Sequence, residues 1–122
     1  MASETTLIGN WGEDLAVEWL RKNKFLIVAR NWRSGRYELD IVAQRGYSLH
    51  IVEVKTRRIS GWTTPEDAMT EAKRISLIRG VNLYLGENPT PLEVQVDFIA
   101  VDIDHNNQSQ VRYIPDAVQA RW

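Results

Sequence analysis

Asp40, Glu53 and Lys55 have the residue types and the spacing that metal-assisted phosphate chemistry requires. Asp40 lies in the stretch YELDIVAQ, and Glu53 and Lys55 lie in SLHIVEVKT. Both stretches are typical of strands, and the short turn RGY between them predicts a hairpin. The two carboxylates are about equally far from that turn, so their Cβ atoms should lie about 5 Å apart. Two like charges at that distance repel, and a divalent cation between them would relieve the repulsion.

Ligands that offer only oxygen atoms favour Mg²⁺ or Mn²⁺ over zinc. Such an ion can activate water and neutralise charge on a phosphate, while a neighbouring lysine stabilises or deprotonates the nucleophile. The alternative is structural: Glu53 and Lys55 form a surface ion pair, and Asp40 is a carboxylate at a strand end. One face of the third strand changes from apolar to charged, which predicts that the sheet opens into a polar cleft there.

The elements that must position these residues follow from hydrophobic periodicity and turn signals. A meander of three antiparallel strands is predicted, and a crossover helix should make the fourth strand parallel to the third. In the second helix we expect Thr64 as the cap, Pro65 at the first position, and a buried stripe that includes Ala72 and Ile75. The fold class is α/β, a mixed sheet with one helix on each face or both on one. The expected helices are 6–23 and 63–86, the strands 25–32, 37–44, 48–56, 92–103 and 111–114, and 115–122 a closing helical turn.

Composition narrows the class of protein further. The chain has 122 residues, 43% of them hydrophobic, and no cysteine, which predicts a single domain over 1–122 without disulfides or thiolate metal sites. It shows no signal-peptide pattern and no apolar run that could span a membrane, so a cytoplasmic location is expected. The net charge is −1, but residues 21–36 carry six basic residues and no acidic one. Such a run could meet a polyanion or simply be a solvated helix end and loop.

Asp40 followed by Glu53-Val54-Lys55 resembles the PD-(D/E)XK nuclease superfamily, whose restriction-endonuclease-like core is a helix, a three-stranded meander, a helix and a further strand. The chain resembles more closely the YraN family of small bacterial proteins, which are similar to Holliday-junction resolvases. The most specific matching segments are ELDIVA and HIVEVKTR. The others are GNWGEDLAVEWL, ARNWR, PEDAMTEAKRISL and VDFIAV.

The resemblance implies that Asp40 and Glu53 are metal ligands and that Lys55 is the catalytic lysine. It also implies that Glu13 helps to hold metal or water, although helical periodicity alone is equally compatible with a solvated glutamate. Glu38 matches a second family carboxylate whose role stays unassigned.

Four basic residues are the best candidates to border the cleft and contact phosphates: Arg57, Arg58, Lys73 and Arg74. Each has an alternative interpretation as a solvated surface charge. Two positions depart from the family pattern. Tyr37 replaces the usual glycine and could change access to the cleft or stack on a base, and Gln95 replaces an arginine. His50 has no catalytic partner visible in the sequence.

The sequence therefore predicts a metal-dependent endonuclease that hydrolyses phosphodiester bonds in DNA, with branched DNA among its candidate substrates. Two alternatives use the same fold: a nucleic-acid-binding module that does not cleave, and a protein-interaction domain. A homodimer is expected only by analogy with resolvases that act on two-fold-symmetric junctions.

Overall fold

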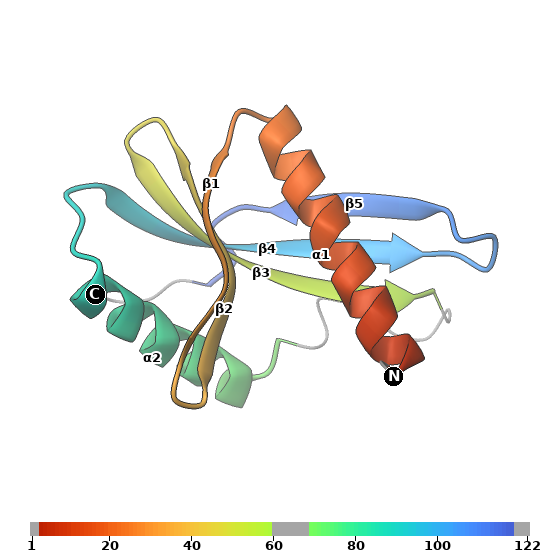
Figure 1. Ribbon diagram of the computed structural model, residues 1–122, viewed down its shortest axis with the longest axis horizontal. Coiled ribbons are helices and arrows are strands. Elements are labelled where there is room, and N and C mark those ends of the chain that lie inside the picture. Colours follow the sequence, from red (N-terminus) through yellow and green to blue (C-terminus); the bar gives the residue numbers. More distant parts are fainter. Residues whose placement is uncertain (1–2, 60–68, 119–122) are drawn as a thin grey trace.

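The computed structural model describes residues 3–59 and 69–118, which form two helices and one mixed sheet (Figure 1). The strands lie in the order β1-β2-β3-β4-β5, with β3 and β4 parallel and the other neighbours antiparallel. This arrangement confirms the predicted meander and parallel fourth strand, and it is consistent with a restriction-endonuclease-like fold. The elements are α1 (Glu4–Lys22), β1 (Leu26–Ser34), β2 (Tyr37–Arg45), β3 (Ser48–Arg58), α2 (Glu71–Glu87), β4 (Glu93–Ile103) and β5 (Ser109–Ile114).

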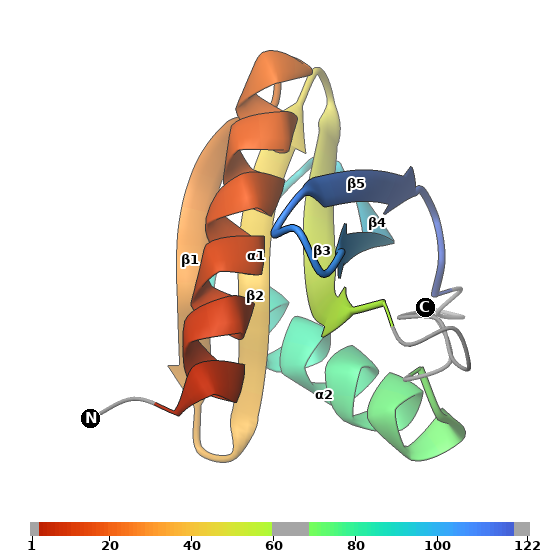
Figure 2. The same ribbon diagram turned by 90° about the vertical axis from the view of Figure 1, so that its right-hand side faces the viewer.

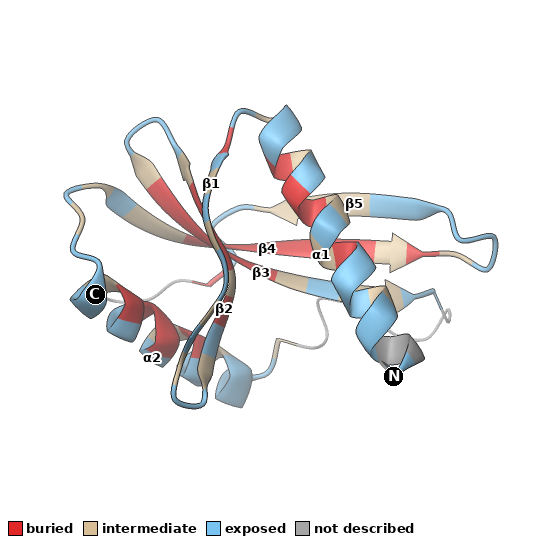
Figure 3. Ribbon diagram, in the orientation of Figure 1, coloured by how far each residue is buried: buried red, intermediate tan, exposed pale blue. Residues whose placement is uncertain are grey.

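The two helices cover opposite faces of the sheet, each over its own hydrophobic core (Figures 1 and 2). Ala16 and Leu20 of α1 pack against Val52 and its neighbours, and Val81 of α2 packs against Ile51 and its neighbours. Because Ile51 and Val52 are consecutive in β3, their side chains point to opposite faces. Buried residues accordingly run along the middle of the sheet and the inner sides of both helices in Figure 3. The sequence left both arrangements of the helices open, and the structure selects one helix on each face.

The second helix begins later than expected. Thr70 is the N-cap, and its side chain accepts a hydrogen bond from the backbone N–H of Lys73 at 3.2 Å. The predicted cap Thr64 and the residues after it, up to position 68, lie outside the described residues. The predicted stripe was also partly wrong, because Ala72 is exposed and Ile75 is 40% exposed. The residues of α2 that are buried are Leu77, Gly80, Val81 and Tyr84.

In residues 115–118 the chain differs from the helical turn expected over 115–122, and residues 119–122 lie outside the described part. Residues 115–118 form a turn and a bend. The backbone N–H of Asp116 donates to the side chain of Asp97, so this segment is fixed to β4 by a hydrogen bond of 2.9 Å rather than by helix formation. Neither described helix is both long and apolar enough to cross a membrane.

The sheet separates on one side of its centre, and this separation positions the candidate site. Pairing between β2 and β3 extends from the turn to Ile41 and Val52. Beyond that pair, residues 37–39 of β2 remain paired with β1, and residues 53–58 of β3 remain paired with β4. The two strands therefore diverge, and we call the space between residues 37–40 and 53–56 the fork.

Candidate metal and nucleic-acid site

Asp40 and Glu53 stand opposite each other at the mouth of the fork. They occupy the position directly after the last paired residues, Ile41 and Val52. Because the ladder ends there, the backbone N–H of Val54 is not used by β2. It donates instead to the Asp40 carboxylate, at 2.8 Å. The side chain of Asp40 thus closes the end of the sheet where a backbone carbonyl would otherwise do so.

Both carboxyl groups resist ionisation. Burial, followed by the charge of Glu53, raises the pKa of Asp40 to about 7. Burial also raises the pKa of Glu53, although the charge and hydrogen bond of Lys73 counteract part of the rise. Glu53 is only 8% exposed, so water screens the pair poorly. The protein holds two anionic groups together where neither is solvated well, which is typical of sites that bind cations or move protons.

Two hollows, one on each side of the sheet, meet beside Asp40. The α1-side hollow has a volume of about 550 Å³, and its lining includes Glu13, Glu38, Asp40 and Lys55. The α2-side hollow has a volume of about 330 Å³, and its lining includes Asp40, Glu53, Lys55 and Lys73. Asp40 and Lys55 line both, so the fork joins the two hollows into one polar cleft.

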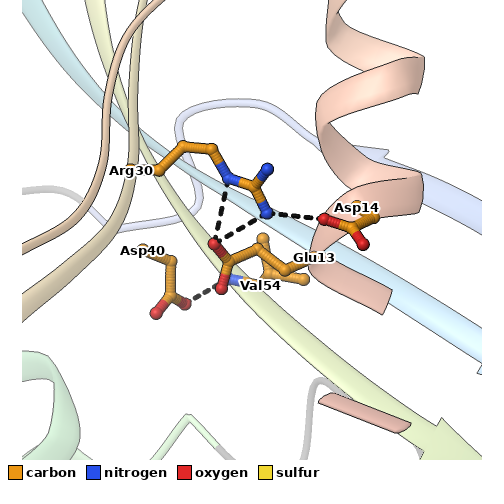
Figure 4. Close-up of polar contacts among 5 residues, drawn as sticks. All are labelled: Glu13, Asp14, Arg30, Asp40 and Val54. Atoms are coloured by element: carbon orange, nitrogen blue, oxygen red, sulfur yellow. Dashed lines mark hydrogen bonds and ion pairs between the residues drawn. The ribbon is translucent and has the colours of Figure 1, made fainter. Parts of the chain in front are cut away.

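Glu13 reaches the α1-side hollow from the helix. Its carboxylate accepts hydrogen bonds from Nε and Nη2 of Arg30, at 3.3 and 3.2 Å, and the same guanidinium binds Asp14 at 2.8 Å. Figure 4 shows Glu13 and Asp40 projecting toward the same space beside Val54. Burial and the charge of Asp40 raise the pKa of Glu13, against the opposing effect of Arg30. Arg30 thus fixes the direction of the Glu13 carboxylate. The sequence had predicted no specific role for Arg30.

A glycine explains why α1 can come so close to β3. A Cβ atom built on Gly12 would lie 1.7 Å from Oγ1 and 2.7 Å from Cβ of Thr56. No rotation of the Thr56 side chain moves its Cβ, so any other residue at position 12 would push the helix away from the strand. The Gly-Glu pair of α1 therefore combines close approach at residue 12 with a carboxylate directed to the site at residue 13.

The two lysines of the site have different surroundings. Lys73 of α2 forms an ion pair with Glu53, with Nζ 3.2 Å from the carboxylate oxygen. The charge of Glu53 raises the pKa of Lys73, which keeps the ammonium group charged. Lys55 is exposed and lines both hollows. Lys73 was expected to contact phosphates; the structure shows its ion pair with Glu53, and the phosphate contact stays a prediction.

The remaining predicted residues lie farther from the carboxylate pair. Glu38 lines the α1-side hollow and pairs with Arg33 at 3.4 Å. Arg74 is held by Glu71 of its own helix, with Nε 2.9 Å from the carboxylate. Arg57 and Arg58 are the last residues of β3, beyond Lys55, and Arg58 donates to the backbone carbonyl of Asp104 at 3.3 Å.

The residues of the fork fit a hydrated divalent cation rather than a closed metal cage. Among residues 3–59 and 69–118, no group of three or more His, Asp or Glu side chains is arranged to hold a metal ion. Mg²⁺ commonly uses one or two protein carboxylates and completes its shell with water and substrate phosphate. Asp40 and Glu53 supply two such carboxylates, and the burial that raises both pKa values makes a positive charge beside them favourable.

A second buried carboxylate was not identified from the sequence. Asp97 of β4 is fully buried and accepts hydrogen bonds from His50, Tyr113 and Gln95 at 2.6, 2.6 and 2.8 Å, besides the one from the Asp116 backbone. His50 therefore has a structural hydrogen-bond partner that the sequence did not reveal, and its lack of a catalytic partner stays a prediction. Asp97 stands within the apolar run VQVDFIAV, where a charged residue needs partners, and that signal could have identified the network.

The sequence of this chain matches one known protein family. A model of the family described as "Uncharacterised protein family UPF0102" matches residues 12–101. The UPF0102 protein FP2501 of Flavobacterium psychrophilum is 38% identical over 110 residues, which cover 90% of this chain and 92% of that protein. The UPF0102 protein BF0634 of Bacteroides fragilis is 36% identical over 115 residues, 94% of each chain. A UPF0102 protein of Nitratidesulfovibrio vulgaris is 47% identical over 77 residues, 63% of this chain and 58% of that protein.

The chain therefore belongs to the UPF0102 family, which is the YraN family that the sequence resembles. The matched span contains Glu13, Asp40, Glu53, Lys55 and Lys73.

Proposed function

We propose that this protein is a metal-dependent endonuclease that hydrolyses phosphodiester bonds in DNA, using Mg²⁺ or Mn²⁺. The observation that carries the proposal is the pair formed by the partly buried Asp40 and the buried Glu53, whose pKa values are raised at the mouth of an open cleft. A module that only binds nucleic acid needs positive charge, and a protein-interaction domain needs apolar area. Neither nucleic-acid binding alone nor protein binding alone explains why the protein keeps Asp40 and Glu53 together, which costs folding free energy.

In this proposal Asp40 and Glu53 hold the cation, and the cation supplies charge neutralisation and a more acidic water. Val54 keeps the Asp40 carboxylate oriented through its backbone N–H. Glu13, positioned by Arg30, orients water in the α1-side hollow. Lys55 reaches both hollows, where its ammonium group can stabilise charge on the phosphate or orient the attacking water. Lys73 supplies positive charge to Glu53.

The partner in this proposal is DNA, with branched DNA as the candidate substrate, and the protein acts in the cytoplasm. Arg57, Arg58 and Arg74 are the proposed phosphate contacts outside the cleft. Because the net charge is −1, affinity should be modest and should fall with salt. A homodimer would suit a two-fold-symmetric junction, and sedimentation of the protein with and without such a junction would test it.

The deciding experiment is a cleavage screen over single-stranded, duplex and branched DNA and over RNA, with Mg²⁺ or Mn²⁺. We expect cleavage of at least one DNA form and a loss of roughly 10²- to 10⁴-fold in rate in Lys55→Ala. The matched control is Lys22→Ala, because Lys22 is a surface lysine paired with Glu18 at the end of α1. Cleavage that survives Lys55→Ala unchanged would contradict the mechanism.

A non-cleaving module remains the second candidate, and the same screen separates it. Binding of DNA without cleavage under any metal condition would favour that candidate. Calorimetric titration of Mn²⁺ into wild type and Asp40→Ala then shows whether the fork binds a cation at all.

A further inference from the structure

A separate hollow lies on the α2 side of the hairpin formed by β1 and β2. It has a volume of about 350 Å³ and is lined by Tyr37, Arg79, Asn82 and Leu83. We call it the Tyr37 hollow. None of these four residues was assigned a role in the proposed hydrolysis, and Leu83 is 41% exposed although it is apolar.

Two arginines surround the tyrosine. Arg36 donates to the Tyr37 hydroxyl at 3.1 Å, and its guanidinium carbon lies 5.2 Å from the ring centroid. Hydrogen bonds from Arg36 and from Arg79 lower the pKa of Tyr37. Among the described residues, neither arginine forms an ion pair with a carboxylate. Both guanidinium groups therefore keep donors for an anionic group from outside the protein.

The combination fits one kind of ligand. An aromatic ring and an aliphatic side chain provide stacking surfaces, Asn82 provides an amide for hydrogen bonds, and two guanidinium groups provide charge for phosphate. Unpaired bases stack on aromatic side chains in this way, whereas the faces of a base inside a duplex are already covered by its neighbours. An apolar protein ligand would use Tyr37 and Leu83 but would leave both arginines without a counterion.

The Tyr37 hollow lies near the fork, because Tyr37 and Asp40 belong to the same strand. Tyr37 is three residues before Asp40 in β2, about 10 Å of extended chain. Its neighbour Glu38 lines the α1-side hollow, together with Arg33 from the paired strand. A nucleic acid at the fork would therefore reach the end of this hairpin within a few nucleotides.

We propose that the Tyr37 hollow receives an unpaired base of the nucleic acid whose phosphodiester bond lies at the fork. This inference rests on the proposed function, since it takes DNA as the partner. It gives the site a preference for DNA in which a single strand leaves a duplex. Tyr37 is then a specificity-determining residue, and Arg36 and Arg79 hold the phosphates on either side of the base.

The test compares three labelled DNAs by fluorescence anisotropy in EDTA, so that binding is measured without cleavage. The DNAs are a blunt duplex, the same duplex with a short single-stranded extension, and the same extension built from abasic sites. Wild type should bind the extension with bases more tightly than the abasic one by roughly 5- to 150-fold, the range of a single stacked base. Tyr37→Ala should lose that difference and keep its affinity for the blunt duplex.

Four variants make the result specific. Tyr37→Phe should keep the preference, because it keeps the ring. Tyr37→Leu should lose it while filling the hollow, which separates loss of stacking from loss of folding. Tyr47→Ala is the matched control, because Tyr47 is 89% exposed in the turn at the other end of β2. Arg79→Gln should reduce the slope of log affinity against log salt by about 1 for the extended DNA.

The outcomes distinguish this inference from the proposed function. Equal preference in wild type and folded Tyr37→Leu, or no preference in wild type for bases over abasic sites, overturns the inference and leaves the nuclease proposal standing. Binding of none of the three DNAs also overturns the inference, and the cleavage screen, which includes branched DNA and metal, then decides the proposed function separately. A preference that depends on Tyr37, in a protein that never cleaves, supports the inference and removes only the hydrolytic part of the proposed function.

Discussion

Asp40 and Asp97 lie on the two strands that flank β3, and their surroundings differ in kind. Asp97 accepts four hydrogen bonds, and these lower its pKa in spite of burial, which acts to raise it. Asp40 accepts one from Val54 and faces Glu53, and its pKa is raised to about 7. The first carboxylate stabilises the fold, and the second lowers its stability. This difference makes Asp40 the better candidate for a functional carboxylate, because functional groups are often held in environments that lower stability.

The largest effect should come from breaking the Asp97 network. Asp97→Ala leaves the donors of His50, Tyr113 and Gln95 buried without their acceptor, at a cost of about 3–5 kcal/mol in the free energy of unfolding. Urea unfolding followed by circular dichroism measures the loss. The control is Asp102→Ala on the same strand, which removes a partly exposed ion pair with Arg112. Similar midpoints for the two variants would contradict the structural role of Asp97.

The fork should be sensitive to how closely α1 approaches it. Gly12→Ala places a methyl group against Thr56 and should destabilise the protein by roughly 1–3 kcal/mol, the usual cost of overpacking. Gly9→Ala, one turn earlier, meets nothing within 4 Å and should stabilise the helix by up to about 1 kcal/mol. Thermal unfolding of the two variants measures the difference. If both substitutions stabilise the protein, the close contact between α1 and β3 is not what fixes the position of Glu13.

Much of the geometry of the fork follows from local sequence. Alternation in β2 and β3 and the turn at residues 45–47 are enough to predict that Asp40 faces Glu53, because a hairpin turn fixes register. The start of α2 at Glu71 could not be predicted, since Thr64 and Thr70 both precede acidic residues and both suit an N-cap. The ion pair between Lys73 and Glu53 depends on where the crossover helix lies, which no local pattern specifies. The same is true of Arg30 and Glu13, which are 17 residues apart.

The pH dependence of the free energy of unfolding should separate Asp40 from Asp97 clearly. As the pH rises, the contribution of Asp40 should fall and that of Asp97 should grow. The pKa of Asp40 is about 7 in the folded protein and roughly 4 in an unfolded chain. Between these values the folded state holds a proton that the unfolded state has released. Stability therefore falls as the pH rises through this window, and it stays low above pH of about 7.

Asp40→Asn removes this loss and keeps an oxygen that can accept from Val54. Its gain over wild type should be small near pH 4 and reach on the order of 4 kcal/mol above pH 7, since the folded and unfolded pKa values differ by roughly three units. Asp97→Asn should behave in the opposite way. Because the folded pKa of Asp97 is lowered, its carboxylate stabilises the protein above the unfolded pKa and loses that contribution as the pH falls. Urea midpoints of the three proteins from pH 2 to pH 8 test both signs, because the Asp97 contribution is lost only below a pH of roughly 4. A pH-independent difference between Asp40→Asn and wild type would mean that the fork does not hold Asp40 in a strained ionised state, and the main argument for a cation there would be lost.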